Sequence, residues 1–147
     1  GLKLVGLRYF NVYGPREAHK GKMASMIWQL YLRMQNGRPR IFKNGEQTRD
    51  QIYVKDCVAA TLLALKAKKN EVYNVGSGKE TSFNKIIELL NKNLGKNLQP
   101  EYIENPYSHF QNATCADLAK AKKFLLFNPK WSIENGVKDY VNFLKGR

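Results

Sequence analysis

Apolar and polar residues follow two different periods along this chain, one typical of strands and one typical of amphipathic helices. Short apolar runs predict strands at residues 2–9, 39–42, 51–54, 71–75 and 99–103. Apolar residues three and four positions apart predict helices at residues 23–35, 57–68, 83–94, 116–125 and 132–144. Strands that alternate with helices in this way indicate an α/β fold with at least part of a parallel sheet. The short strands at 39–42 and 51–54 are expected to lie outside that sheet.

Polar and glycine residues bound most of these helices. Asp56 precedes one helix and is expected to cap it, with Val58, Leu62 and Leu65 on the buried face. The other expected N-caps are Thr81 or Ser82, and Ser132, whereas Gly37 and Gly95 are expected to end helices.

The segment from Gly6 to Ser25 is the leading candidate for a functional segment. The run 2–9 is apolar enough for a strand buried on both faces. The chain then breaks at Gly14-Pro15 and passes through a charged loop into the helix predicted at 23–35. The apolar stripe of this helix is Met23, Met26, Ile27, Leu30 and Met34. An α/β sheet presents functional groups to a ligand where its strands open into such loops.

The net charge is +13, from 25 basic and 12 acidic residues among 147. Such a charge suits a nucleic-acid surface, an anionic small molecule such as a nucleoside diphosphate, or solvation alone. The lysines are scattered instead of interleaved with stacking aromatics, which argues against nucleic acid. No apolar run is long enough for a membrane span, so we expect a cytoplasmic location and no membrane partner. The chain lacks an initiator Met and enters a strand almost at once, as expected of an internal fragment.

Other catalytic and metal-binding patterns are weak. Cys57 and Cys115 lie far apart without metal-ligand spacing, so two reduced thiols and no metal site are expected. The turn 76–78, Gly-Ser-Gly, lacks the further glycine of a dinucleotide fingerprint and is interpreted as a turn before a capped helix. The two histidines, His19 and His109, lie in unrelated loops.

Three motifs carry a more specific signal. They are RYFNVYGPR at 8–16, FKNGEQTRDQIYVKD at 42–56 and YNVGSG at 73–78. Together they resemble the extended short-chain dehydrogenase/reductase family, the NAD(P)-dependent sugar-nucleotide epimerases and dehydratases. The likeness covers essentially all 147 residues and aligns them with the family's C-terminal half. It implies the last strands of a Rossmann-type sheet plus a small α/β substrate-binding domain. It also implies that residues 1–147 lack the N-terminal NADP-binding portion.

Within this family, REAHKGKMAS at 16–25 and NPYSHFQNATCAD at 105–117 resemble the branch that epimerises C6 of ADP-heptose. The resemblance implies an ADP-sugar substrate, used in making lipopolysaccharide core precursors. C6 would be oxidised transiently to a ketone, with hydride returning to the opposite face. The cofactor would be NADP, or NAD, bound mainly by the absent N-terminal half. The intact parent protein is expected to be a homo-oligomer.

Matched position by position, the resemblance gives a role to eight residues. Lys20 would be the catalytic acid/base and would also contact the cofactor, as would Val12. The substrate-binding positions would be Asn11, Lys22, Gln29, Phe42, Arg49 and Phe110. Lys22, Gln29 and Phe110 stand where this branch usually has Ser, His and Tyr. Because a free lysine titrates near ~10.4, Lys20 must be desolvated or held near other cations to act as a base.

The missing motifs limit what this chain is expected to do. It contains no glycine-rich NADP loop, and no Tyr is followed four residues later by Lys. We therefore expect that the polypeptide alone neither binds NADP tightly nor turns over substrate. Two alternatives stay open. One is another UDP- or GDP-sugar epimerase or dehydratase of the family; the other is a non-catalytic basic module that binds anionic ligands or nucleic acid.

Overall fold

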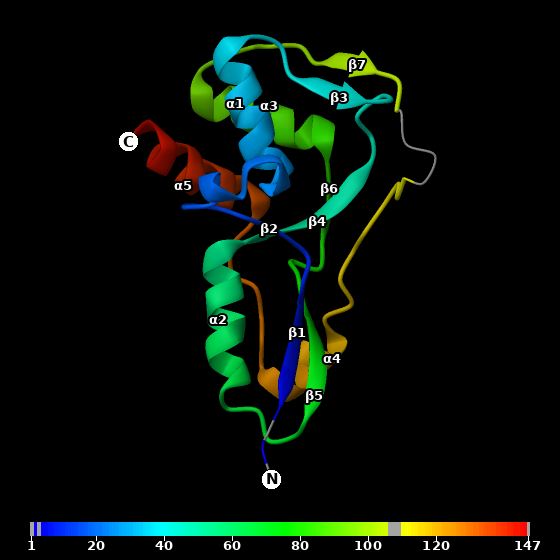
Figure 1. Cartoon of the computed structure of the whole chain (residues 1–147), viewed down its shortest axis with the longest axis vertical. Coiled ribbons are helices and arrows are strands. Elements are labelled where there is room, and N and C mark those ends of the chain that lie inside the picture. The colour runs from blue at the N-terminus through cyan, green and yellow to red at the C-terminus, as the bar shows by residue number, and fades with distance from the viewer. Residues whose placement is uncertain (1, 3, 106–109, 147) are drawn as a thin grey trace.

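The computed structural model describes residues 2, 4–105 and 110–146. Its strands are β1 (Val5–Tyr9), β2 (Asn11–Tyr13), β3 (Arg40–Phe42), β4 (Thr48–Tyr53), β5 (Glu71–Val75), β6 (Glu80–Ser82) and β7 (Glu101–Ile103). Its helices are the 3₁₀ helix η1 (Ala18–Met23) and α1 (Met26–Asn36), α2 (Val54–Ala64), α3 (Phe83–Leu94), α4 (Ala119–Leu125) and α5 (Ile133–Lys145). The molecule is elongated, with β1, β5 and the N-terminus at one end and β3 and β7 at the other (Figure 1).

The strands form three small sheets within the described residues. β1 pairs in parallel with β5, and β3 pairs in parallel with β7. β4 lies between β2, to which it is parallel, and β6, to which it is antiparallel. β3 and β4 thus lie outside the β1–β5 sheet, as predicted. The sequence pattern missed β6, because only four residues, 79–82, separate the preceding turn from the helix that Ser82 caps.

The first strand is less buried than its composition predicted. β1 begins at Val5, and its residues are half-buried or exposed. Among the described residues, β1 has β5 as its one strand neighbour. The prediction of burial on both faces is therefore wrong for this chain, because an apolar strand is buried only where other elements cover it.

The predicted start and buried face of the second helix are also wrong. α2 begins at Val54, so Asp56 lies inside its first turn and does not cap it. Its buried residues are Asp56, Cys57 and Ala60. The predicted core face is exposed instead: the exposed fraction is 55% for Val58, 59% for Leu62 and 80% for Leu65. The helix carries apolar residues on two faces, and the face with small side chains is the one that packs.

The remaining helices largely follow the predictions. α1 begins at Met26, where Ser25 Oγ accepts a hydrogen bond from Trp28 N at 3.2 Å. Met23 is 86% exposed, because the extended backbone of Ala24 and Ser25, with ψ of 159° and 154°, separates it from α1. Ser82 and Ser132 cap α3 and α5 as expected, whereas α4 begins three residues later than predicted. The predicted stripe of α1 is buried at Ile27, Leu30 and Met34.

The apolar core that contains residues of α1, α3 and α5 depends on a close contact between α5 and β2. Tyr13 is almost fully buried and belongs to the same apolar cluster as Val137 and Tyr140. A Cβ atom added to Gly136 would lie 2.0 Å from the Tyr13 hydroxyl oxygen. α5 can therefore approach the strand this closely because position 136 has no side chain.

Asp50 connects three segments through one fully buried carboxylate. Its oxygens accept hydrogen bonds from Ser77 N at 2.6 Å, Ser77 Oγ at 2.7 Å, Gly78 N at 2.9 Å and Ala116 N at 3.0 Å. β4 is thereby tied to the turn after β5 and to the segment before α4. The N–H groups of this Gly-Ser-Gly turn are directed at a side chain of the protein itself.

Asp56 performs a similar function at the start of α2. Its carboxylate accepts hydrogen bonds from Lys130 N and Trp131 N at 3.0–3.1 Å. This contact fixes the loop that leads into α5, which explains an aspartate at this position without any capping role.

Tyr53, Lys55 and Asp139 connect β4 and α2 to α5. The Asp139 carboxylate accepts a hydrogen bond from the Tyr53 hydroxyl and one from Lys55 Nζ at 2.9 Å. The Tyr53 hydrogen bond, followed by that of Lys55, lowers the pKa of Asp139.

The four donors around Asp50 predict a large effect of removing its charge. We expect Asp50→Asn to lower the free energy of unfolding by about 3 kcal/mol, because the amide NH₂ would face backbone donors in a buried site. Asp117→Asn is the matched control, since this exposed carboxylate accepts one N–H, from Ala119. Urea denaturation of both variants measures the difference; equal and small losses would contradict this role of Asp50.

The Asp139 contact predicts an acid-dependent component of stability. Because its pKa is lowered in the folded state, its stabilising contribution is present above the ordinary aspartate pKa of about 3.9 and is lost as the pH falls through the folded value. We expect Asp139→Asn to be less stable than the wild type at neutral pH, and the gap in melting temperature to narrow as the medium is acidified. A gap that stays constant with pH argues against this linkage.

Candidate functional site

A large cavity of the described structure lies between α1, β3 and β4. Its volume is about 1020 Å³, and side chains from β2, α3 and β7 complete its wall. Six of the eight residues with a predicted role line this cavity: Asn11, Val12, Gln29, Phe42, Arg49 and Phe110. A cavity of this size is large enough for a cofactor or a nucleotide.

Arg49 supplies a positive charge on the β4 side of the cavity. Its Nη1 donates to the Thr48 carbonyl at 2.7 Å, and its guanidinium carbon lies 5.2 Å from the Phe110 ring centroid. Phe110 in turn packs edge-on against Phe42, with ring centroids 6.1 Å apart. Partial burial lowers the pKa of Arg49, but a guanidinium remains charged at neutral pH. The aromatic contact restrains the side chain that would meet an anion.

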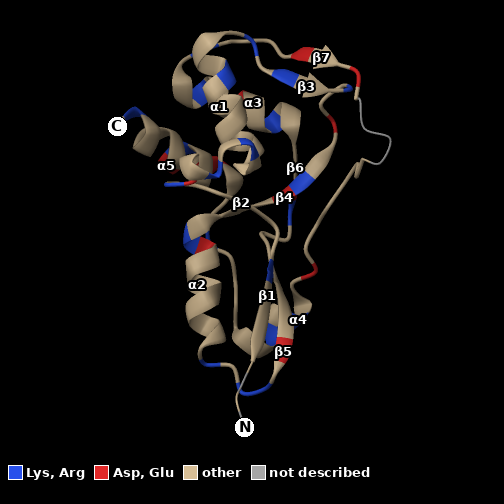
Figure 2. Cartoon of the chain, in the orientation of Figure 1, with Lys and Arg blue, Asp and Glu red and all other residues tan. Residues whose placement is uncertain are grey.

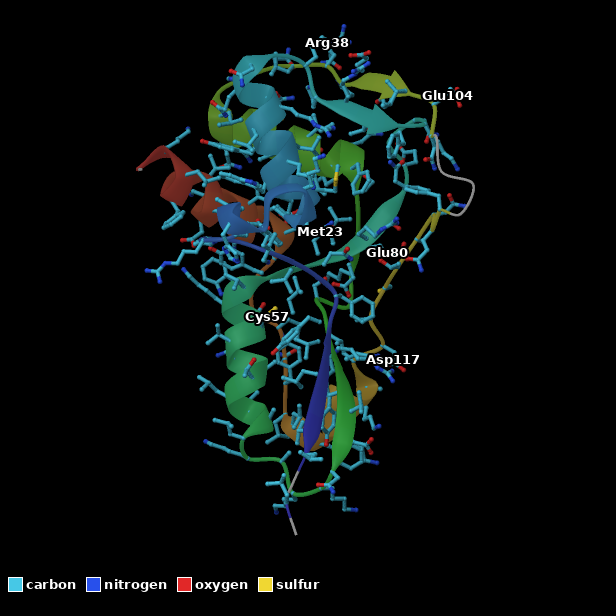
Figure 3. All side chains as sticks on the ribbon, viewed as in Figure 1. Met23, Arg38, Cys57, Glu80, Glu104 and Asp117 are labelled. Carbon is cyan, nitrogen blue, oxygen red and sulfur yellow. The ribbon has the colours of Figure 1, made fainter. Side chains whose placement is uncertain are left out.

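Three further arginines line the same cavity and were not singled out from the sequence. Arg33 Nη1 donates to the Arg40 carbonyl at 2.8 Å, and Arg38 donates to the carbonyls of Gln99 and Pro100. Arg38 lies at the end of the molecule farthest from the N-terminus (Figure 3). No acidic side chain occurs among the described residues that line the cavity. The signal in the sequence was the close spacing of these arginines around the end of α1.

Asn11 and Val12 lie on β2, opposite Gln51 and Ile52 of β4. Asn11 Nδ2 donates to the Asp50 carbonyl at 3.1 Å, which fixes the amide at the cavity wall. Val12 is half-buried and packs against a second apolar cluster, separate from that of Tyr13, to which Cys57 belongs. β2 therefore presents one polar and one apolar side chain next to each other.

Lys20 and Lys22 are not among the described residues that line the cavity. Both are exposed and lie in η1. Gln29 connects this loop to the cavity, because its Nε2 donates to the Lys22 carbonyl at 3.1 Å and to the Ala24 carbonyl at 2.8 Å. The structure thus brings together six of the eight predicted residues and leaves the two lysines beside them.

Glu17 fixes both ends of the loop that carries these lysines, and the sequence analysis did not identify it. It is 4% exposed, and its carboxylate accepts hydrogen bonds from Gly14 N at 3.3 Å, Ser25 N at 2.7 Å and Ser25 Oγ at 2.8 Å. The end of β2 and the N-cap of α1 therefore share one buried carboxylate.

Other kinds of site are not found in the part of the chain that the structure describes. No group of three or more His, Cys, Asp or Glu side chains could hold a metal ion there. Cys57 is buried and Cys115 exposed, both as free thiols, as predicted. None of the described helices has the length and apolar composition needed to cross a bilayer.

Comparison with known proteins identifies the family. The model of the "NAD dependent epimerase/dehydratase family" matches residues 1–76, which include β1, β2, β4 and β5. The chain belongs to this family. The predicted fold class, α/β and part of an extended short-chain dehydrogenase/reductase, is confirmed by solved structures that superpose on nearly the whole chain.

Curated and solved relatives include epimerases of different sugar nucleotides. The chain is 39% identical to the ADP-L-glycero-D-manno-heptose-6-epimerase of Fusobacterium nucleatum, over 95% of its own length and 48% of the relative's. The crystal structure of the enzyme of that name from Helicobacter pylori has a TM-score of 0.90 and 39% identity, covering 99% of this chain and 45% of the other. The UDP-glucose 4-epimerase of Thermotoga maritima, solved with UDP-glucose, also has a TM-score of 0.90 and 39% identity, covering 99% and 47%.

These relatives confirm the predicted resemblance to the heptose epimerases and also show its limit. A heptose epimerase and a UDP-glucose epimerase are equally similar to this chain. The sugar-nucleotide epimerase family is therefore established, whereas the particular sugar is not fixed by similarity. The chain spans about half the length of the relatives it matches.

Proposed function

We propose that this chain is the substrate-binding portion of a nicotinamide-dependent sugar-nucleotide epimerase that inverts C6 of ADP-heptose. The observation that carries the proposal is the cavity in which Arg49, Asn11 and Val12 meet. These residues come from two separate motifs, and the pairing of β2 with β4 brings the motifs together. The similarity to heptose epimerases over nearly the whole chain supports the choice of sugar nucleotide.

The cationic wall of the cavity is suited to the diphosphate. A guanidinium binds phosphate oxygens in a two-pronged geometry, and Arg49 is held in place by Phe110. Arg33 and Arg38 add positive charge from the α1 side of the cavity. The aromatic pair Phe42 and Phe110 would contact the nucleotide, and Asn11 would hydrogen-bond the sugar.

The cofactor in this proposal is NADP or NAD, which supplies reversible hydride removal from the sugar carbon. This chain's own glycine-rich turn does not fit the cofactor's diphosphate, because the Asp50 carboxylate already accepts hydrogen bonds from Ser77 and Gly78 N–H. We therefore propose that a separate nucleotide-binding portion holds the cofactor. Residues 1–147 would contribute Val12 as an apolar contact beside it.

Lys20 is proposed as the proton-transfer group. Burial raises the pKa of the Cys57 thiol to about 12, and the positive charge of Lys20 opposes that shift. The charge of Lys20 thus acts on Cys57, which shares an apolar cluster with Val12. The link through Cys57 supports a position for Lys20 beside the proposed cofactor contact. Lys20 is exposed in this chain, so the desolvation that a lysine base needs would come from the nucleotide-binding portion and the bound sugar.

A UDP-sugar epimerase is the second candidate, favoured by the equal similarity to the Thermotoga enzyme. A nucleic-acid-binding module has less support. Lys and Arg residues occur from one end of the molecule to the other in Figure 2 and do not gather along one element. Binding to a phosphate backbone is strongest where basic groups line one continuous surface.

Thermal unfolding with nucleotides tests the binding half of the proposal. We expect ADP to raise the melting temperature of the wild-type chain, and Arg49→Met to weaken ADP binding about tenfold or more, since it removes a charge-assisted contact. Arg8→Met is the matched control, because Arg8 is exposed on β1 and does not line the cavity. Equal protection of Arg49→Met and wild type would remove Arg49 from the site. Stronger protection by UDP than by ADP would favour the second candidate.

The proposed role of Lys20 requires an enzyme that also contains a nucleotide-binding portion. In such a protein, we expect Lys20→Met to reduce the rate of epimerisation at least a hundredfold, the scale of a lost acid/base group. Lys92→Met, at an exposed site on α3, is the control. Near-normal turnover by the Lys20 variant, measured with ADP-heptose, would exclude Lys20 from the chemistry.

A further inference from the structure

Gln51 carries a buried amide oxygen without a hydrogen-bond partner among the described residues. Its side chain belongs to the middle of β4 and is 4% exposed. Its Oε1 is fully buried and accepts no hydrogen bond from the described residues. Leaving such a group unsatisfied costs about 1–3 kcal/mol, and nearly all buried polar groups in proteins are paired. The amide therefore requires an explanation that the folded chain alone does not give.

Gln51 lies next to two residues that are proposed to contact the ligand, Asn11 and Arg49. Gln51 lies directly opposite Asn11 in the parallel β2–β4 pair, and both residues line the large cavity. Arg49 lies two residues earlier on β4, so its side chain and that of Gln51 leave the strand on the same face, roughly 7 Å apart. One strand face thus presents a cation and then a neutral amide to the same cavity.

The chemistry of an amide selects the part of the ligand that it would contact. A glutamine amide can donate and accept, which matches a hydroxyl group, whereas a phosphate offers only acceptors. Arg49 already provides the charge that a diphosphate needs. Asn11 and Gln51 lie beyond Arg49 and supply two neutral amides, which suits the hydroxyl-bearing sugar.

Gln51 also lines a smaller cavity of about 700 Å³. Neither Asn11 nor Arg49 is among its described lining residues, and its charged lining residues are Lys79, Glu80, Lys85, Lys130 and Glu134. That cavity offers no further residue of the β2–β4 face, so the large cavity is the one in which Gln51 has matching neighbours.

We infer that the Gln51 amide hydrogen-bonds a sugar hydroxyl in the large cavity and so distinguishes a sugar nucleotide from the free nucleotide. This inference rests on the proposed function and adds a specificity residue to it. The bound sugar would supply a partner for the buried Oε1 atom of Gln51.

The test compares Gln51→Met with Gln47→Met in this chain. Gln47 is a matched control because it is 5% exposed, both of its amide atoms lack partners, and it does not line the cavity. Isothermal titration with ADP-heptose and with ADP measures both affinities; UDP-glucose and UDP replace them if the chain prefers uridine nucleotides. We expect Gln51→Met to weaken sugar-nucleotide binding about five- to tenfold and to leave the free nucleotide unchanged. Gln47→Met should change neither affinity.

Melting temperatures measured without ligand separate recognition from folding. Methionine has a volume similar to that of glutamine and needs no partner, so Gln51→Met should unfold at the wild-type temperature or above it. If it does not fold, Gln51→Leu takes its place. Unchanged sugar-nucleotide affinity, or an equal loss for sugar nucleotide and free nucleotide, would overturn the inference while the proposed function stands. A wild-type chain that binds none of the four ligands would overturn both.

Discussion

Buried carboxylates that bind backbone N–H groups hold this molecule together. Asp50 is the central case, since its four donors come from the turn after β5 and from the segment before α4. A charge in the interior is tolerated only when hydrogen bonds replace its lost hydration. Those donors exist only when β4, β5 and the chain around residue 116 are all in place. Glu17 repeats this arrangement at the end of β2, where it binds the N–H groups of Gly14 and Ser25. Asp56 repeats it at the loop before α5.

Local patterns in the sequence predicted most helices and strands but not which faces are covered. The caps at Ser82 and Ser132 were predictable because each depends on a contact three residues away. The core face of α2 was not, because Val58 and Ala60 lie on different apolar faces and only tertiary packing decides between them. Asp56 was misinterpreted for a related reason. Its partners lie 74 and 75 residues away, where no local rule reaches.

Some residues of the candidate site could likewise be predicted from the sequence, and others could not. Asn11 and Arg49 were found because they belong to motifs that resemble a known family, and the strand pairing explains why both motifs reach one cavity. Arg33 and Arg38 join them only because α1 and the segment after it line the same cavity as β4, which periodicity does not express. Gln51 was overlooked because it lies inside a motif without being one of its defining residues.

The alternation of Arg49, Asp50 and Gln51 along β4 has a consequence for the register of the strand. Successive side chains point to opposite faces, so Arg49 and Gln51 line the cavity while Asp50 points toward Ser77. A slip of one residue would direct a guanidinium at backbone N–H groups and place a carboxylate among arginines. Charge, and not only apolar burial, therefore locks the pairing of β4. An insertion or deletion in β4 would shift the register and expose each of these side chains to the wrong face. A change in ligand preference is therefore expected through substitutions at fixed positions of this strand.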